Sequence, residues 1–125
     1  MMMENIEKQV HDLYYGQDAN CARTTLLCLS GLFDAPIERQ TMAAAVGMHG
    51  AGGFRAQCGL VEGGLMFIGI YCDHLGKTEE EAVDCCYHYA EAFRDQFHSL
   101  RCRELRPTGF SPDDPPHMCE GLTCE

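Results

Sequence analysis

Residues 52–64, GGFRAQCGLVEGG, place one cysteine, Cys58, among five glycines immediately before the most apolar run of the chain, residues 65–72. The segment from about Gln57 to Leu75 is long, lacks the strict alternation of a half-buried strand, and is closed by Gly76. It therefore predicts an apolar helix, and the glycines of residues 47–53 predict a loop in front of it.

Further helices are predicted on both sides of this segment. Asp18 or Asn20 can cap a helix that ends near Leu32, and Thr78 and Glu81 form a capping box at the start of another. Apolar residues at helical spacing also predict helices over residues 3–15, 38–46 and 78–97, and a short helical turn is predicted at 100–105. Strand signals are almost absent, so the sequence predicts an all-α fold, a compact bundle of about five helices.

The length of the chain indicates one domain. A chain of 125 residues, 46% of them hydrophobic, is long enough for one core and too short for two. We expect residues 1–125 to form a single helical, cysteine-rich domain. Prolines at positions 107, 112, 115 and 116 oppose regular structure, so residues 107–125 are predicted to be an extended tail that packs back on the helices.

Charge and hydropathy exclude several kinds of partner. Nineteen acidic against nine basic residues give a net charge of −10, which disfavours nucleic acid and anionic membranes. The longest apolar run is far shorter than the ~20 residues needed to span a bilayer. The first residues also lack the basic and apolar regions of a signal peptide. We therefore expect a cytoplasmic protein without membrane insertion.

Nine cysteines in a reducing compartment indicate metal binding or redox chemistry more than a disulfide framework. Helix geometry separates Cys21 from Cys28 by ~10 Å and Cys58 from Cys72 by ~21 Å, so neither pair can share one metal ion. Cys85 and its neighbour Cys86 are interpreted as small buried hydrophobic residues. No CxxCH sequence is present, which argues against covalent haem c.

Three cysteines share a position in the predicted helices. Cys21, Cys58 and Cys102 each fall where a helix starts, and there the unpaired amides and the helix dipole favour a thiolate. Their common position predicts a convergent site, to which Cys119 of the tail could add a fourth thiol, with Cys124 as a spare. The alternative is chance, because nine cysteines and about five helices would place one or two there anyway.

These residues resemble those of a family of redox-active proteins named for its cysteine pattern, C, then GCAxxG, then C and C. The resemblance extends from residues 20–22 through 58–63 and 97–105 to Cys119. It implies that the four family cysteines are Cys21, Cys58, Cys102 and Cys119. Gln57 and Leu60 depart from the core motif, standing where glycine and a small residue are usual. A related module accompanies an iron–sulfur centre in split-Soret cytochromes, and the missing CxxCH implies the cluster without the haem.

The leading hypothesis is an iron–sulfur protein with a [4Fe–4S] or [2Fe–2S] cluster on these four cysteines. Gly53 and Gly59 would let backbone amides approach the cofactor closely. The protein would transfer electrons to a partner protein or a small molecule, or act as an oxidoreductase if one iron is open to substrate. The alternatives are metal-free thiol–disulfide chemistry, with Cys58 as the attacking thiol, and structural zinc in an interaction protein.

The glycines of the apolar helix also bear on assembly. Gly59 and Gly63 lie one turn apart, Gly69 follows, and each helical glycine costs up to ~1 kcal/mol relative to alanine. Close approach of another helix would offset this cost. That helix could belong to the same domain or to the partner in a homodimer.

Overall fold

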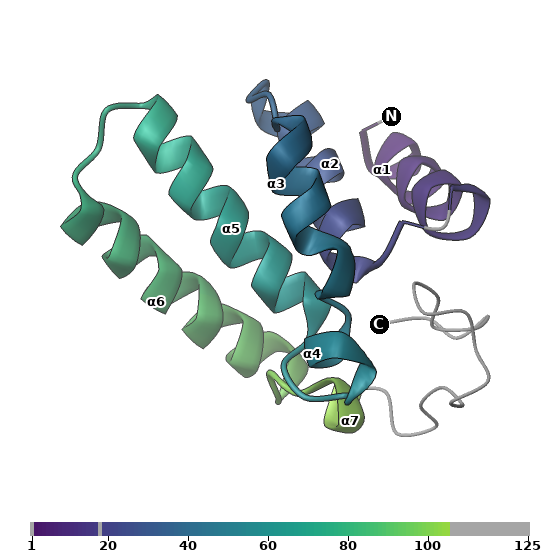
Figure 1. Ribbon diagram of the computed structural model, residues 1–125. Coiled ribbons are helices and arrows are strands. Elements are labelled where there is room, and N and C mark those ends of the chain that lie inside the picture. Colours follow the sequence, from purple (N-terminus) through teal and green to yellow (C-terminus); the bar gives the residue numbers. More distant parts are fainter. Residues whose placement is uncertain (1, 18, 106–125) are drawn as a thin grey trace.

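The computed structural model describes residues 2–17 and 19–105, and this part of the chain is all-α, as the sequence predicts (Figure 1). No helix in these two ranges is long and apolar enough to cross a membrane. The helices are α1 (Met2–His11), which runs into a π-helical turn (Asp12–Gly16), α2 (Cys21–Phe33), α3 (Arg39–Ala44) with a 3-10 turn (Ala45–Gly47), α4 (Gly50–Gly53), α5 (Gly59–His74), α6 (Glu79–Phe97) and α7 (Cys102–Leu105).

Helix α5 is the centre of the molecule. It packs against α2 on one side and against α6 on the other, and α5 and α6 run antiparallel as a hairpin (Figure 1). The short helices α4 and α7 gather at the start of α5 (Figure 1). The main core lies between α2, the end of α3 and α5, and its buried residues are Ala22, Leu26, Ala35, Ala45 and Phe67.

The helix ends confirm the capping residues read from the sequence. The Asn20 side chain caps α2 by accepting a hydrogen bond from the Arg23 amide, whereas Asp18 lies outside the described residues. Thr78 and Glu81 form the predicted capping box of α6. Gly76, with φ at +74°, closes α5 as expected.

The prediction that residues 47–53 form a loop is wrong in one respect. Residues 50–53, α4, form a single left-handed turn with φ between +57° and +87°, and the Gly53 amide donates to the His49 carbonyl at 3.1 Å. A left-handed turn is costly for residues with a Cβ, and three of the four positions here are glycine. The apolar helix also begins two residues later than predicted, because Gln57 pairs with Arg101 in an isolated antiparallel bridge.

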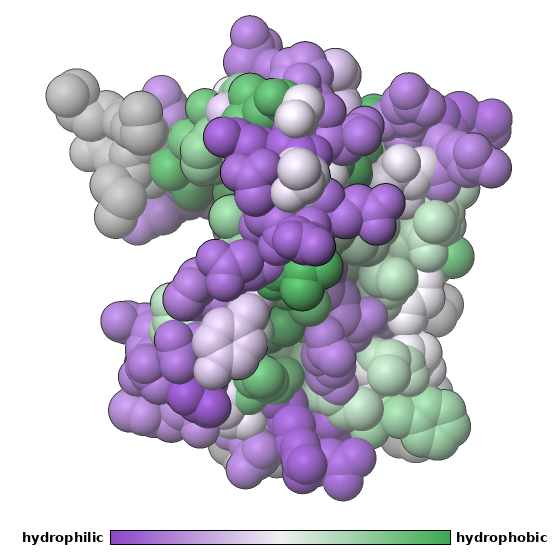
Figure 2. Space-filling view, turned by 90° about the vertical axis from the view of Figure 1, so that its left-hand side faces the viewer, coloured by the Kyte–Doolittle hydropathy of each residue, from purple (hydrophilic) through white to green (hydrophobic). Residues whose placement is uncertain are grey.

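The burial predicted for Cys85 and Cys86 is also corrected. Cys85 is exposed and Cys86 is half-buried. Helix α6 contacts α5 through one narrow stripe of side chains, and Phe93 is the one buried residue of α6. The rest of the α6 surface faces solvent, which explains the exposure of Cys85. The face shown in Figure 2 is accordingly mostly hydrophilic, with hydrophobic residues reaching the surface between hydrophilic ones. The predicted tail, with Cys119 and Cys124, lies outside the described residues.

The glycines of α5 meet their helical neighbours within the chain. A Cβ on Gly63 would lie 2.7 Å from the Ala22 carbonyl oxygen and 3.0 Å from the Thr25 Cβ. Gly59 is equally close to α2, whereas no atom lies within 4 Å of a Cβ on Gly69. Packing of α5 on α2 therefore accounts for Gly59 and Gly63 but not for Gly69. The homodimer that the glycines also allow stays a prediction.

Substitution of these glycines should have opposite effects on stability. Gly63→Ala should destabilise the protein by about 1–3 kcal/mol, because the new methyl group meets backbone atoms of α2 that cannot move aside. Gly69→Ala, in the same helix and in open space, should stabilise by up to ~1 kcal/mol through helix propensity. Urea denaturation followed by circular dichroism measures both, and equal effects of the two variants would contradict the packing of α5 on α2.

Candidate functional site: three cysteines at helix starts

Cys21 is the first residue of α2 and is buried, with 4% of its surface exposed. The preceding residue, Asn20, is completely buried, and its amide donates to the carbonyls of Ala45 and Val46, both at 2.9 Å. These two bonds add to its capping bond and fix the start of α2 against the turn that follows α3. The position of the Cys21 thiol is therefore set by a rigid anchor.

Cys58 is the N-cap residue of α5, although its side chain makes no capping hydrogen bond. The next residue, Gly59, packs on Cys21. A Cβ on Gly59 would lie 2.6 Å from the Cys21 Cβ and 2.8 Å from the Met48 carbonyl oxygen. Leu60 packs both on the cluster that contains Cys21 and on the one that contains Cys58. The starts of α2 and α5 thus lie in direct contact, each with a buried cysteine.

Cys102, the first residue of α7, reaches the same place through backbone pairing. The Cys58 amide donates to the Leu100 carbonyl at 2.8 Å, and the Cys102 amide donates to the Ala56 carbonyl at 2.6 Å. This pattern surrounds the bridge between Gln57 and Arg101, whose side chains are exposed. Because side chains alternate along paired strands, the buried Cys58 and Cys102 share the opposite face.

The left-handed turn α4 supports this pairing. A Cβ on Gly50 would lie 3.0 Å from the Arg55 Cα and 3.5 Å from the Cys102 Cβ, so the turn packs directly on the pair. Arg103 then ties the two segments together, because its amide and its side chain both donate to the Arg55 carbonyl, at 3.0 and 3.2 Å. Gly50 thus helps to position Cys102, and the loop to which it belongs leads into Cys58.

Apolar side chains cover Cys58. It forms a buried cluster with Val61 and Phe93, on which further apolar residues pack. Tyr89 of α6 belongs to this cover and donates its hydroxyl to the Leu60 carbonyl at 2.9 Å. Burial raises the pKa of Tyr89, and a negative charge on Cys58 raises it further. No local sequence pattern indicates this contact, because it joins residues 29 positions apart.

Glu62 is an acidic group within one turn of Cys58 that the sequence reading missed. Its amide bonds the Cys58 carbonyl at 3.0 Å, and its side chain is half-buried. Burial raises its pKa above 4.5, and a hydrogen bond from the Ala51 amide of α4 opposes part of that rise. The Oε1 atom is buried without a hydrogen-bond partner among the described residues. The carboxyl group is therefore easier to protonate than a solvated one.

Of the four predicted ligands, Cys21 and Cys58 lie at helix starts that contact each other, and Cys102 is joined to Cys58 through backbone pairing. Within residues 2–17 and 19–105, no three histidine, cysteine or acidic side chains lie close enough to hold one metal ion. Cys119, the fourth predicted ligand, is outside these ranges. Of the predicted glycines, Gly59 lies against Cys21, and the Gly53 amide is bonded to His49 within α4.

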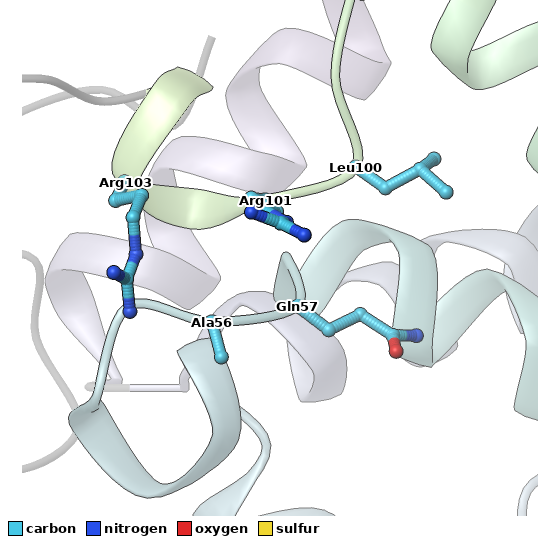
Figure 3. A pocket seen from close by; sticks show the side chains of 5 residues that line it. All are labelled: Ala56, Gln57, Leu100, Arg101 and Arg103. Carbon is cyan, nitrogen blue, oxygen red and sulfur yellow. The ribbon is translucent and has the colours of Figure 1, made fainter.

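A pocket of ≈ 460 Å³ opens beside the pairing of Cys58 and Cys102. Figure 3 shows the two chain segments side by side, with the guanidinium of Arg103 reaching toward the segment of Ala56. The lining combines two arginines with the ends of the paired segments, namely Ala56, Gln57, Leu100, Arg101 and Arg103. In a chain of charge −10, this pocket is a local concentration of positive charge.

Fold and cysteines together define a helical protein that gathers buried thiols at the starts of its helices. The family model described as "Putative redox-active protein (C_GCAxxG_C_C)" matches residues 19–125. The chain belongs to this redox-active family, as the resemblance of its motifs indicates. No curated protein and no solved structure matches the chain.

Asn20→Ala should disturb the site through the anchor of α2. The substitution removes the cap and leaves the carbonyls of Ala45 and Val46 without their buried donor, so we expect a loss of about 2–4 kcal/mol. Asn20→Ser, which keeps a capping oxygen, should lose less. Chemical denaturation of both variants measures the difference, and equal losses would show that the cap contributes nothing.

Glu62→Gln should raise the melting temperature at pH 7. Because folding raises the pKa of Glu62, its favourable contribution is complete below pH 4.5 and is lost as the pH rises through the folded value. The variant should therefore match the parent protein at pH 4 and exceed it at pH 7. Thermal unfolding at both pH values measures this, and a lower melting temperature at pH 7 would contradict the burial cost.

Glu81→Gln is the matched control of opposite sign. The hydrogen bonds with Thr78 lower the pKa of Glu81, so its contribution is present above pH 4.5 and is lost as the pH falls. This variant should melt lower than the parent protein at pH 7.

Proposed function

We propose that the protein is an iron–sulfur redox protein whose cluster is held by Cys21, Cys58, Cys102 and a fourth cysteine. The observation that carries the proposal is that three buried cysteines lie at three separate helix starts whose backbones pack or pair with one another. Four thiolates are the usual ligand set of [2Fe–2S] and [4Fe–4S] clusters. Cys119 is the fourth ligand that the family pattern supplies, and Cys124 is the alternative.

A donor set made of cysteine thiols alone fits an iron–sulfur cluster and also a structural zinc ion. Sulfurs around one tetrahedral zinc lie about 3.8 Å apart, given Zn–S bonds of about 2.3 Å. Cys58 and Cys102 are diagonal neighbours across the pairing, a relation that places Cα atoms about 7–8 Å apart. Because each side chain carries its sulfur away from Cα, this spacing suits two ligands of one zinc ion as well as two ligands of a cluster. The preference for a cluster rests instead on the redox-active family, since zinc has no redox chemistry.

The same spacing bears on thiol–disulfide exchange. A disulfide requires Cα atoms about 4.4–6.8 Å apart, closer than diagonal neighbours usually lie. Closing a bond between Cys58 and Cys102 would pull on a pairing held by the amides of both cysteines and by Arg103. The rigidity of the pairing therefore favours ligand roles for both residues over a dithiol role.

A bound cluster would supply one-electron transfer, and the chain's own residues would set its surroundings. Cys21 and Cys58 lie at the starts of α2 and α5, where the positive end of each helix dipole would stabilise negative sulfur. Val61, Tyr89 and Phe93 keep water from Cys58. The pocket of Arg101 and Arg103 is the opening beside the site, and its charge favours an anionic small molecule or an acidic partner surface.

Anaerobic reconstitution with iron and sulfide tests the proposal. The parent protein should turn brown, absorb visible light, and contain iron and acid-labile sulfide in equal amounts. Cys21→Ala and Cys58→Ala should each retain roughly half of this iron or less, since each removes one of four ligands.

Cys28→Ala is the matched control, because Cys28 is also a buried cysteine of α2 but packs against Leu13 and Ala19, away from the site. It should bind iron as the parent protein does. A colourless protein that contains zinc, or an equal loss of iron in Cys28→Ala, would overturn the proposal.

A further inference from the structure

A second pair of cysteines meets at the other end of α5. Cys72, in the last turns of α5, is buried, and Cys85 of α6 is exposed. Cys85 is near enough to Cys72 to raise the pKa of that thiol, and both residues line one pocket between the two helices. Neither residue belongs to the cysteine pattern of the family. Two thiols are too few for a structural zinc site, which takes four ligands.

The pair opens into an apolar pocket of ≈ 270 Å³. Both cysteines line this pocket, so a small molecule within it can contact both residues. The Tyr89 hydroxyl in its wall is already committed to the Leu60 carbonyl. The other lining residues lack charged groups: Leu29, Phe33, Gly64, Phe67, Ile68 and Tyr71.

We propose that Cys72 and Cys85 form a redox-active dithiol that small, uncharged disulfides oxidise to an α5–α6 disulfide bond. The Cys85 thiolate attacks one sulfur of the small disulfide, forms a mixed disulfide and releases one thiolate. Cys72 then gives up its proton and attacks the Cys85 sulfur, which releases the second thiolate. The two thiol protons pass to the two released thiolates. The protein loses two electrons, and the small disulfide becomes two thiols.

The order of attack follows from the surroundings of the two thiols. Cys85 is exposed and can meet the incoming disulfide first. Burial raises the pKa of Cys72, and the neighbouring Cys85 raises it further, which suits a thiol that reacts second and over a short distance. Cys86 is adjacent in sequence but points about 100° away around the helix, with its thiol toward the Leu65 carbonyl at 3.9 Å.

The charges near the pocket limit which small disulfides can enter it and oxidise the two cysteines. The pocket contributes no basic residue, and the Glu81 carboxylate is near enough to Cys72 to raise the pKa of that thiol. With a net charge of −10 on the chain, an anionic disulfide is repelled. An uncharged disulfide avoids the cost of removing a charge from water when it enters an apolar pocket.

The proposal is independent of the iron–sulfur centre. Cys72 follows Cys58 by fourteen residues, which places it ~21 Å along α5. The dithiol can therefore be tested in protein with or without iron.

The experiment treats the reduced full-length protein with 2-hydroxyethyl disulfide, blocks remaining thiols, and maps the bonds by mass spectrometry. Digestion with trypsin and a glutamate-specific protease separates Cys58 from residues 63–77, which carry Cys72, and leaves Cys85 in residues 82–91. We expect these two peptides to be linked through Cys72 and Cys85. Glutathione disulfide, which is anionic, should react about tenfold more slowly.

Three variants separate the roles of the cysteines. Cys72→Ser should stop at a mixed disulfide on Cys85, Cys85→Ser should abolish the link, and the matched control Cys86→Ser should keep it. Linkage through Cys86, a mixed disulfide that persists on Cys85 of the parent protein, or no reaction at all would overturn the dithiol. Equal rates with the two disulfides would overturn the preference for an uncharged oxidant.

Discussion

The start of α5 lies directly against the start of α2, and the candidate site depends on this contact. It is possible only because Gly59 and Gly63 have no Cβ, which would fall within 2.6–2.7 Å of α2 atoms. A contact of backbone with backbone leaves no side chains that could rearrange, so the two helices have one relative position. Cys21 and Cys58 flank that contact, and their separation is therefore as rigid as the helix packing itself.

The second constraint on the candidate site is the antiparallel pairing of Gln57 with Arg101, which places Cys102 on the same face as Cys58. An isolated bridge has little stability of its own, so other contacts must hold it. They come from the left-handed turn of Gly50–Gly53, which packs on Cys102, and from Arg103, which bonds the Arg55 carbonyl with its side chain and its amide. The glycine-rich loop therefore has a definite conformation, in which the left-handed turn of residues 50–53 places Gly50 against Cys102.

Local signals in the sequence predicted local structure well. The Asn20 cap, the Thr78 and Glu81 box and the Gly76 stop are short-range patterns, and each has the predicted role. The cysteines at helix starts could be read for the same reason. The pairing of Gln57 with Arg101 joins residues 44 positions apart through one bridge, and such a pairing leaves no periodic pattern. The exposure of Cys85 was missed because it depends on how α6 crosses α5, which propensity does not set.

Helix α5 carries sulfur at both ends, and Tyr89 of α6 physically connects the two regions. Its hydroxyl bonds Leu60, two residues after Cys58, and its ring packs on Gly64 and lines the pocket that Cys72 and Cys85 share. Gly64 leaves no room for a change in this contact, because a Cβ there would overlap the Tyr89 ring. Any shift of α6 along α5 would therefore have to move Tyr89 relative to Leu60. The hydrogen bond of Tyr89 thus helps to fix the position of α6 on α5 between the two groups of cysteines.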